Sequence, residues 1–332
     1  MNLEKEFCET INEINKKMIQ NTNSSVSLVN NIIKQLITAG GKRLRGILVV
    51  KAGKAGNYEQ NNLYNIAAAL EILHLATLIH DDVIDEAELR RGQKAVQKKY
   101  NKDLAVLCGD FLYNRSFRHF SQNLSKQSLN KLHKIEKLIC EGEAKQYYNK
   151  YNFEISIYDY LRRIRRKTAL LFAFSTYVGA YESGITDINL NHFYNIGLNL
   201  GIAYQIRDDI LDYTGSIKNI GKDTRQDLAA GILTLPLILL LQKDQYKKKI
   251  KKIIKRDQQN ITAKDLSKII IMIKEANCLE KSINYYNRFV SKSYTHLQSL
   301  KKNFEVADIE NIIERLINNK PQTKLEYSAI SL

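Results

Sequence analysis

The sequence predicts an all-α protein, and three observations support this fold class. The chain has 2 prolines and 15 glycines among its 332 residues, and so few helix-breaking residues favour long helices over many short strands. Apolar residues recur at helical spacing along almost the whole chain. Neither a strand-turn-helix unit nor a glycine-rich nucleotide loop is apparent. With 44% hydrophobic residues, we expect one large helical domain over 1–317, followed by a short, poorly ordered polar tail over 318–332.

Helical periodicity and the breaks between periodic segments define the expected elements in chain order. Breaks are expected at paired glycines or turn-forming residues, such as Gly40-Gly41, Ser183-Gly184 and 214–224. Several segments are apolar on most faces, which is typical of helices in the interior of a bundle. The predicted helices are 2–20, 25–38, 44–55, 61–88, 94–100, 104–122, 125–149, 156–182, 189–213 and 228–242.

The net charge of +16 raises the question of an anionic partner, such as nucleic acid, an anionic membrane surface or an anionic substrate. The lysine-rich segment 244–256 is the strongest local concentration of charge. It lacks interleaved aromatic residues that would stack on bases, so a solvated amphipathic helix is the better interpretation. A nucleic-acid partner is therefore not expected, whereas peripheral contact with a membrane stays open.

The cysteines and the apolar segments indicate the cellular compartment in which we expect the protein. The four cysteines form no C-x-x-C pair and lie near no histidine at zinc spacing, so we expect free, buried thiols in a reducing environment. The N-terminal segment has no apolar core typical of a secretory signal. The longest apolar run, about 228–241, is shorter than the about 20 residues that cross a bilayer. These features predict a cytoplasmic protein.

Two aspartate clusters with the same internal spacing are the most informative feature of the chain. In a helix, positions i and i+4 share a face, so the first and third aspartates of each cluster point the same way. Their apolar neighbours indicate a buried setting, in which carboxylates must be paired or bound to metal. A single such cluster is most often a solvated helix face, but two copies in apolar segments favour Mg²⁺. The clusters consist of Asp81, Asp82 and Asp85, and of Asp208, Asp209 and Asp212.

Three basic clusters complement the aspartates. Lys42, Arg43 and Arg45 follow paired glycines, where backbone N–H groups and guanidinium groups can meet an anion. A second cluster, at 90–92, is Arg90-Arg91-Gly92. The third is Lys167-Thr168. Each has a plain alternative, such as a helix break with chance basic residues or a lysine extending from an apolar helix. Together with the aspartates they predict two diphosphate sites. One diphosphate would be bridged to the protein by metal, and the other would be bound directly by lysine and arginine.

These motifs resemble the trans-isoprenyl diphosphate synthases, the polyprenyl synthetase family, in residues, spacing and order from about 25 to 245. The resemblance implies the isoprenoid synthase fold, a helical bundle around a central cavity, and medium- or long-chain products. The motifs are GGKRLR (40–45), DDVIDEAELRRG (81–92), GD (109–110), EGEAKQ (141–146), KTALL (167–171), YQIRDDILD (204–212), GK (221–222), DLAAG (227–231) and TLP (234–236).

The resemblance assigns roles residue by residue. It implies that the aspartates of both clusters hold Mg²⁺ on an allylic diphosphate, with Asp82 and Asp209 as supports, and that Arg90 contacts this diphosphate. It implies that Lys167 and Lys222 neutralise the developing negative charge. Thr168 and Gln205 would shape the same site. Isopentenyl diphosphate would be bound by Lys42, Arg45, His74 and Arg91.

The implied reaction is head-to-tail condensation of an allylic diphosphate with successive isopentenyl units, in a cavity that excludes water. Ala76 and Thr77 lie about one turn before Asp81, where short-chain members of the family have aromatic residues. Their small size predicts an open tunnel and a medium- or long-chain polyprenyl diphosphate, of the kind used for quinone side chains. The family also implies a homodimer.

Several residues depart from the family pattern, and other functions remain open. The departures put turn geometry and active-site closure in question rather than metal binding. The alternatives are a short-chain farnesyl or geranylgeranyl synthase, a terpene cyclase or head-to-head synthase, a subunit of a heteromeric synthase, and a basic nucleic-acid binder. The departures are Gly46 and Lys94 for proline, Arg225 for glycine, Ile232 for lysine, Tyr204 for phenylalanine, and the tail without its usual arginine.

Overall fold

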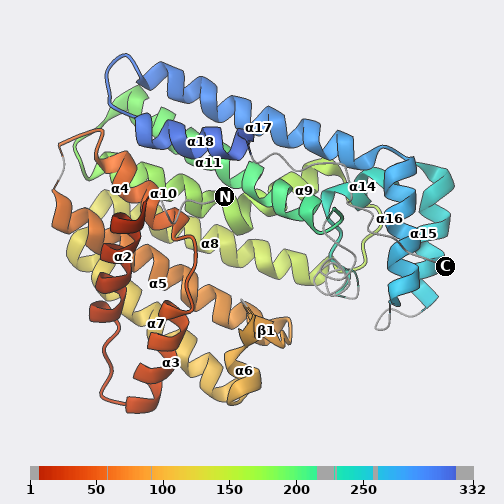
Figure 1. Cartoon of the computed structure of the whole chain (residues 1–332), viewed down its shortest axis with the longest axis horizontal. Coiled ribbons are helices and arrows are strands. Elements are labelled where there is room, and N and C mark those ends of the chain that lie inside the picture. The colour runs from red at the N-terminus through yellow and green to blue at the C-terminus, as the bar shows by residue number, and fades with distance from the viewer. Residues whose placement is uncertain are drawn as a thin grey trace. The chain divides into compact units, whose positions relative to one another are not determined.

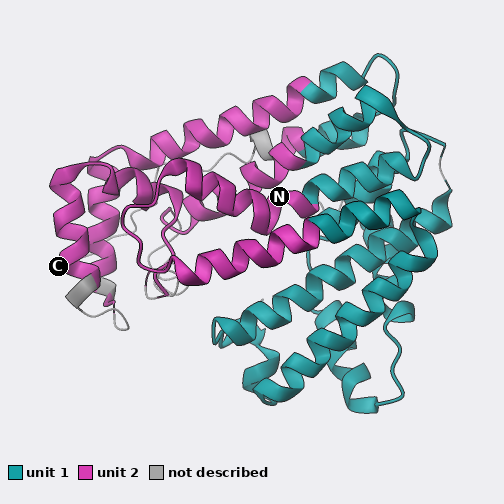
Figure 2. Cartoon of the chain, turned by 180° about the vertical axis from the view of Figure 1, so that it is seen from behind, with its two compact units in different colours: residues 1–134, 172–197, 296–312 teal, residues 135–171, 198–295, 313–332 magenta. Residues whose placement is uncertain are grey.

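The computed structural model describes residues 7–57, 59–90, 92–214, 228, 230–256 and 261–318. Within these residues the chain is helical apart from turns and a hairpin of two-residue strands, β1 (Leu89–Arg90) and β2 (Gln93–Lys94) (Figure 1). The all-α prediction is confirmed. The chain forms two compact units that interleave in sequence (Figure 2), and each is described by itself. The expected single domain over 1–317 stays a prediction.

Unit 1 comprises residues 1–134, 172–197 and 296–312, and its core is built around one helix. Helix α5 packs against α2, α4 and α7. By length and composition α5 could cross a membrane, yet 72% of its most apolar window is buried inside the protein. The helices that lie wholly in this unit are α2 (Cys8–Asn21), α3 (Ser27–Thr38), α4 (Leu44–Gly53), α5 (Gln60–Ile84), α6 (Val96–Lys99) and α7 (Lys102–Asn123).

Close packing in unit 1 depends on small residues. A Cβ atom added at Gly179 would lie 2.1 Å from the carbonyl oxygen of Val49, so α10 (Leu170–Tyr181) approaches α4 almost to backbone contact. The glycine is therefore required by this close approach. On α5, Ala67, Ala68 and Ala69 are completely buried.

Unit 2 comprises residues 135–171, 198–295 and 313–332. Its core includes α14, every residue of which is buried and which packs against α9, α15 and α16. The helices that lie wholly in this unit are α9 (Ile157–Ile164), the π-helix η1 (Arg165–Ala169), α14 (Leu235–Leu241), α15 (Asp244–Arg256) and α16 (Ala263–Glu275). Residues of both units belong to α8 (Lys126–Tyr148), α10, α11 (Asp187–Leu211), α17 (Cys278–Leu300) and α18 (Ala307–Asn318).

The structure corrects several predicted boundaries. The helix expected over 61–88 ends at Ile84, because Glu86 adopts a left-handed backbone with φ of 52°. Residues 230–234, which were expected to be helical, form a turn and an irregular segment, and helix α14 begins at Leu235, in line with the preference of proline for the first helical turn, where Pro236 lies. The segment 156–182 is interrupted by η1. Helices α16 to α18 were not among the predicted segments.

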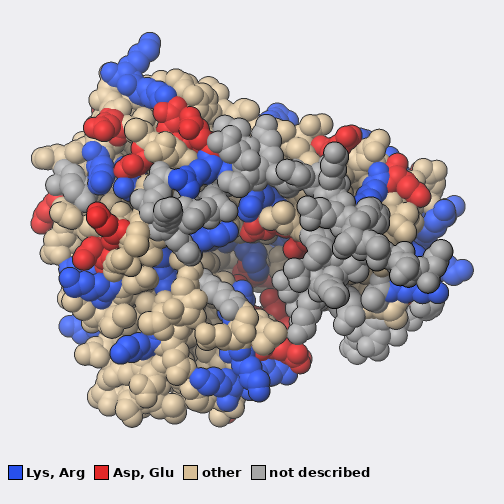
Figure 3. Space-filling model, in the orientation of Figure 1, with Lys and Arg blue, Asp and Glu red and all other residues tan. Residues whose placement is uncertain are grey.

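The structure confirms the expectation for the lysine-rich segment and corrects the one for the cysteines. The lysine-rich segment forms amphipathic helix α15, whose Ile250 and Ile254 are completely buried. On the face drawn in Figure 3, basic side chains are scattered and interspersed with acidic ones. All four thiols are free, as expected. Cys8 and Cys140 are exposed, however, so the expectation that every thiol is buried was wrong.

Candidate active site

The first aspartate cluster lies at the C-terminal end of α5. Asp85 is the residue directly after the helix, and its N–H donates to the carbonyl oxygen of Asp81 over 2.8 Å. The Asp81 side chain is half-buried and that of Asp85 is exposed. Carboxylates at this end of a helix meet its negative dipole, which disfavours them and favours a cation.

Asp82, between these two residues, has a different environment. It is 5% exposed, and its Oδ1 accepts hydrogen bonds from Nε of Arg90, over 2.9 Å, and from Nη2 of the same guanidinium. Burial opposes the charge on Arg90, but Asp82, Asp81 and Asp85 outweigh it and raise the pKa of Arg90. The side chain of Gln97 donates to the Asp82 carbonyl oxygen over 2.6 Å. Asp82 therefore fixes Arg90 beside the other two aspartates.

The second cluster repeats this local arrangement at the C-terminal end of α11. Asp212 follows the last helical residue, Leu211, and its N–H donates to the carbonyl oxygen of Asp208 over 3.1 Å. The side chains of Asp208 and Asp212 are half-buried. A guanidinium nitrogen of Arg207 lies 3.7 Å from Asp208. The outer aspartates of both clusters thus close the last turn of a helix.

Asp209, the middle residue of the second cluster, is buried in a hydrogen-bonded chain. Tyr160 donates to its Oδ2 over 2.7 Å, and the Gln205 amide donates to its Oδ1 over 2.9 Å. Thr168 in turn donates to Gln205 Oε1 over 2.9 Å. Burial raises the pKa of Asp209 although these donors oppose the shift. The chain connects the Lys-Thr motif to the second aspartate cluster within unit 2.

Lys167 and Thr168 lie in the π-helix η1, which sequence periodicity did not reveal. Such π-helical turns are rare and occur frequently at functional sites. The Lys167 ammonium donates to Oε2 of Glu143 over 3.0 Å. Glu143 had no role assigned from sequence, although it lies in the EGEAKQ motif. Tyr160 was also missed, because no signal in the sequence connects it with Asp209.

The basic cluster after the paired glycines divides into buried and half-buried residues. Gly40 and Gly41 form a loop with positive φ, and α4 begins only at Leu44. Arg43 is 3% exposed and bonds Asn15 and the carbonyl oxygen of Ile37, so it holds the loop in place. Lys42 and Arg45 are half-buried, and the Arg45 guanidinium lies 4.7 Å from the ring centre of Phe172.

The N–H of Gly46 makes a hydrogen bond that a proline at this position would lack. It donates to Oε1 of buried Glu71 over 2.9 Å. Glu71 also lies 3.9 Å from the Arg43 guanidinium. A proline would remove the N–H and leave the carboxylate with one donor fewer. Gly46 and Glu71 thus stabilise the start of α4 together.

The remaining predicted site residues either lie on α5 or fall outside the described residues. His74 and Thr77 are half-buried, and the Thr77 hydroxyl donates to the His74 carbonyl oxygen over 2.8 Å. Ala76 is completely buried. The roles of Arg91 and Lys222, and the departure at Arg225, concern residues that the structure does not describe.

Within the described part of the chain, no group of three or more histidine, cysteine, aspartate or glutamate side chains is gathered as a metal site. The donor chemistry nevertheless suits Mg²⁺. Each cluster presents two partly accessible carboxylates at the negative end of a helix, and hard oxygen ligands are those that Mg²⁺ prefers. The middle aspartates, in contrast, are occupied by Arg90, Tyr160 and Gln205.

Comparison with known proteins identifies relatives along most of the chain. Residues 26–270 match the polyprenyl synthetase family. The chain is 35% identical over 268 residues to heptaprenyl diphosphate synthase component 2 of Geobacillus stearothermophilus, covering 81% of this chain and 82% of that protein. It is 36% identical over 246 residues to octaprenyl diphosphate synthase of Escherichia coli (strain K12), covering 72% and 75% respectively.

Solved structures show the same fold. A polyprenyl synthase from Caulobacter crescentus CB15, in complex with calcium and isoprenyl diphosphate, matches with a TM-score of 0.85 and 30% identity over 95% of this chain and 94% of that one. A heptaprenyl diphosphate synthase from Staphylococcus aureus matches with a TM-score of 0.86 and 28% identity over 96% and 99%. With its ordered motifs, its helical architecture and these matches, the chain is a trans-prenyltransferase of the polyprenyl synthetase family.

Proposed function

We propose that this chain condenses an allylic diphosphate with successive isopentenyl diphosphate units, head to tail and in trans, to a medium- or long-chain polyprenyl diphosphate. The relatives support this chain-length class, because they include heptaprenyl, octaprenyl and solanesyl diphosphate synthases. The proposal rests on the local structure that is repeated at 81–85 and 208–212. In each cluster two carboxylates lie at the end of a helix, and a buried aspartate supports them.

In this proposal the acidic residues bind metal and the basic residues bind or neutralise the diphosphate groups. The paired aspartates of each cluster would hold Mg²⁺, which neutralises the departing diphosphate and so favours ionisation of the allylic C–O bond. Arg90, fixed by Asp82, and Lys167, held beside Glu143, supply further positive charge. For isopentenyl diphosphate we assign Lys42, Arg45, His74 and Arg91.

The product would serve as the side chain of a quinone. Consistent with this class, the small residue Ala76 stands on α5 before the first cluster. We further propose a cytoplasmic homodimer with peripheral membrane contact, through which a long apolar product could leave. The lysines of α15 are suited to an anionic lipid surface.

A second candidate is the catalytic subunit of a heteromeric synthase. It is favoured by the similarity to proteins named component 2 of heptaprenyl diphosphate synthase in Geobacillus stearothermophilus and in Bacillus subtilis (strain 168), the latter at 34% identity over 294 residues. In this case the purified chain would bind its substrates but turn them over only with a partner protein.

The deciding experiment incubates the purified chain with farnesyl diphosphate, isopentenyl diphosphate and Mg²⁺, and measures product length by chromatography. Polyprenyl diphosphates formed by the chain alone support the homomeric enzyme. Binding of both substrates without turnover favours the heteromeric subunit. Consumption of the allylic substrate without isopentenyl diphosphate would contradict the proposal and favour a cyclase. Parallel reactions with EDTA in place of Mg²⁺ serve as the control.

A further inference from the structure

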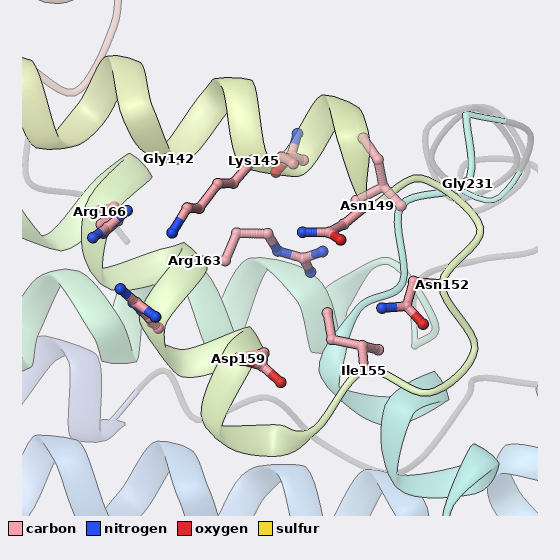
Figure 4. Close-up of a pocket in the computed structure, with 12 residues that line it drawn as sticks. Gly142, Lys145, Asn149, Asn152, Ile155, Asp159, Arg163, Arg166 and Gly231 are labelled. Atoms are coloured by element: carbon pink, nitrogen blue, oxygen red, sulfur yellow. The ribbon is translucent and has the colours of Figure 1, made fainter.

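A cavity of about 320 Å³ lies in unit 2, between the C-terminal half of α8 and the segment formed by α9 and η1. Its wall is unusually basic. Side chains of Lys145 and Arg163 extend from the two sides into the same space (Figure 4). The cationic lining residues are Lys145, Arg162, Arg163 and Arg166.

Among the described residues that line the cavity, one carboxylate stands against these cations. Asp159 forms the capping box at the start of α9, where it accepts from the hydroxyl of Ser156 over 2.5 Å and from its N–H over 3.4 Å. The Asp159 carboxylate is therefore already hydrogen-bonded to the N-terminal end of α9. Arg163 donates to the carbonyl oxygen of Leu233, and its positive charge also acts on the buried carboxyl group of Asp209. The described residues of the wall therefore offer little negative charge to balance its cations.

Arg166 gives a second, independent indication of a ligand. Its Nη1 is completely buried and has no hydrogen-bond acceptor within the described residues. Gly142 lets this side chain approach α8, because a Cβ atom at that glycine would lie 3.0 Å from the Arg166 Cβ. A buried guanidinium N–H without an acceptor is unfavourable, and an anion in the cavity, which Arg166 lines, would supply the acceptor once the guanidinium turns toward it.

The other lining groups can orient a polyoxyanion. The carboxamides of Gln146, Asn149 and Asn152 line the cavity, and each carries two N–H donors. Forked guanidinium groups suit phosphate geometry especially well. None of the aspartates of the two clusters lines this cavity, nor do Lys167, Thr168 or Gln205.

We propose that this cavity is a binding site for a phosphate-bearing anion, separate from the described residues assigned above to the two prenyl substrates. The shared chemistry is a diphosphate group held by Arg162, Arg163 and Arg166 with Lys145. Two sources present this group: inorganic diphosphate, which prenyl transfer releases, and a nucleoside di- or triphosphate. The site does not depend on the proposed product length or on the oligomeric state.

The test is isothermal titration of inorganic diphosphate into the full-length chain in EDTA, which suppresses metal-dependent binding. Arg166→Gln should weaken one binding event about tenfold or more, as expected for the loss of a charge-assisted hydrogen bond to phosphate. The matched control is Arg165→Gln, because Arg165 is the exposed neighbour in the same helical turn and does not line the cavity. It should bind like the wild type.

Three outcomes would overturn the proposal: no binding by the wild type, equal binding by Arg166→Gln, or equal weakening by Arg165→Gln, which would indicate diffuse attraction. Arg162→Gln repeats the test if Arg166→Gln does not fold, because Arg162 is exposed. A parallel titration with ATP distinguishes the two sources by which anion binds tenfold more tightly. The prenyl transfer assay runs separately, so failure of this site and failure of the proposed function are distinguishable.

Discussion

The hydroxyl of Tyr160 donates a 2.7 Å hydrogen bond to Asp209, a carboxylate that is 4% exposed. Burial raises the pKa of Asp209, and burial together with the neighbouring carboxylate raises the pKa of Tyr160 well above its ordinary value. The tyrosine therefore stays protonated as a donor. This pair stabilises the middle of the second aspartate cluster from a residue 49 positions earlier in the chain.

Tyr160→Phe should lower the free energy of unfolding by about 1–3 kcal/mol, because a buried carboxylate oxygen loses its donor. Chemical denaturation followed by circular dichroism measures the loss. Tyr158→Phe is the matched control, since Tyr158 is on the same helix but 72% exposed and should leave stability unchanged. Equal stability of the two variants would show that the Tyr160 hydrogen bond contributes nothing.

The same pair predicts a pH dependence. Because the folded pKa of Asp209 is raised above its model value of 3.8, the folded state binds this proton more tightly than the unfolded state. The resulting stabilisation is present below about pH 3.8 and is lost as pH rises through the folded pKa. Tyr160→Phe should raise that pKa further, so the stability difference from the wild type should widen with rising pH. A difference that narrows between pH 4 and 7 would contradict this sign.

Asp81→Asn and Asp208→Asn should each reduce Mg²⁺-dependent kcat by about 10²-fold or more, if these carboxylates hold the metal that stabilises the departing diphosphate. Steady-state assays over a Mg²⁺ titration measure the change. Asp187→Asn is a suitable control, because Asp187 lies on the same helix as Asp208 but in its first turn. Its left-handed backbone, with φ of 58°, accommodates asparagine well. An unchanged Mg²⁺ titration for Asp81→Asn and Asp208→Asn would remove the metal assignment.

The sequence predicted the parts of the site that depend on local spacing. Spacing placed Asp81 with Asp85 and Asp208 with Asp212 on shared helix faces, and each pair closes the last turn of a helix. Spacing could not reveal that Asp82 accepts hydrogen bonds from Arg90, or that Asp209 accepts one from Tyr160. These contacts depend on tertiary packing. The π-helix around Lys167 was missed for a different reason. Its apolar pattern is helical, and an added residue in one turn leaves that pattern almost unchanged.

Gly46→Pro should destabilise the fold by about 1–3 kcal/mol, because the N–H that Gly46 donates to Glu71 is lost. The family pattern suggests the opposite, since proline is usual at this position. Gly46→Ala separates the two effects. It keeps the N–H, and its Cβ would lie 2.9 Å from the terminal methyl of Ile14, which can shift. Thermal unfolding should therefore rank Gly46→Pro below Gly46→Ala, and the reverse order would show that Glu71 does not need this donor.

Ala76→Phe should shorten the product, because a phenyl ring on α5 before the first aspartate cluster would block the growing prenyl chain. Ala76 is completely buried, so the substitution can act in two ways. The ring enters a tunnel and shortens the product with little loss of stability, or it overpacks the core and lowers the free energy of unfolding by about 1–3 kcal/mol. Ala68→Phe, at another completely buried alanine of α5, is the matched control and should destabilise the protein without shortening the product.

Product length from farnesyl diphosphate and isopentenyl diphosphate, measured beside the unfolding temperature, separates these outcomes. A stable Ala76→Phe enzyme with fewer isoprene units in its product places the tunnel along this face of α5. A stable variant with the same distribution of products as the wild type would contradict that placement, because a ring that neither strains the fold nor meets the product cannot lie in the path of chain growth. The proposed chain-length control would then have to move to other residues, whereas the aspartate clusters would be unaffected.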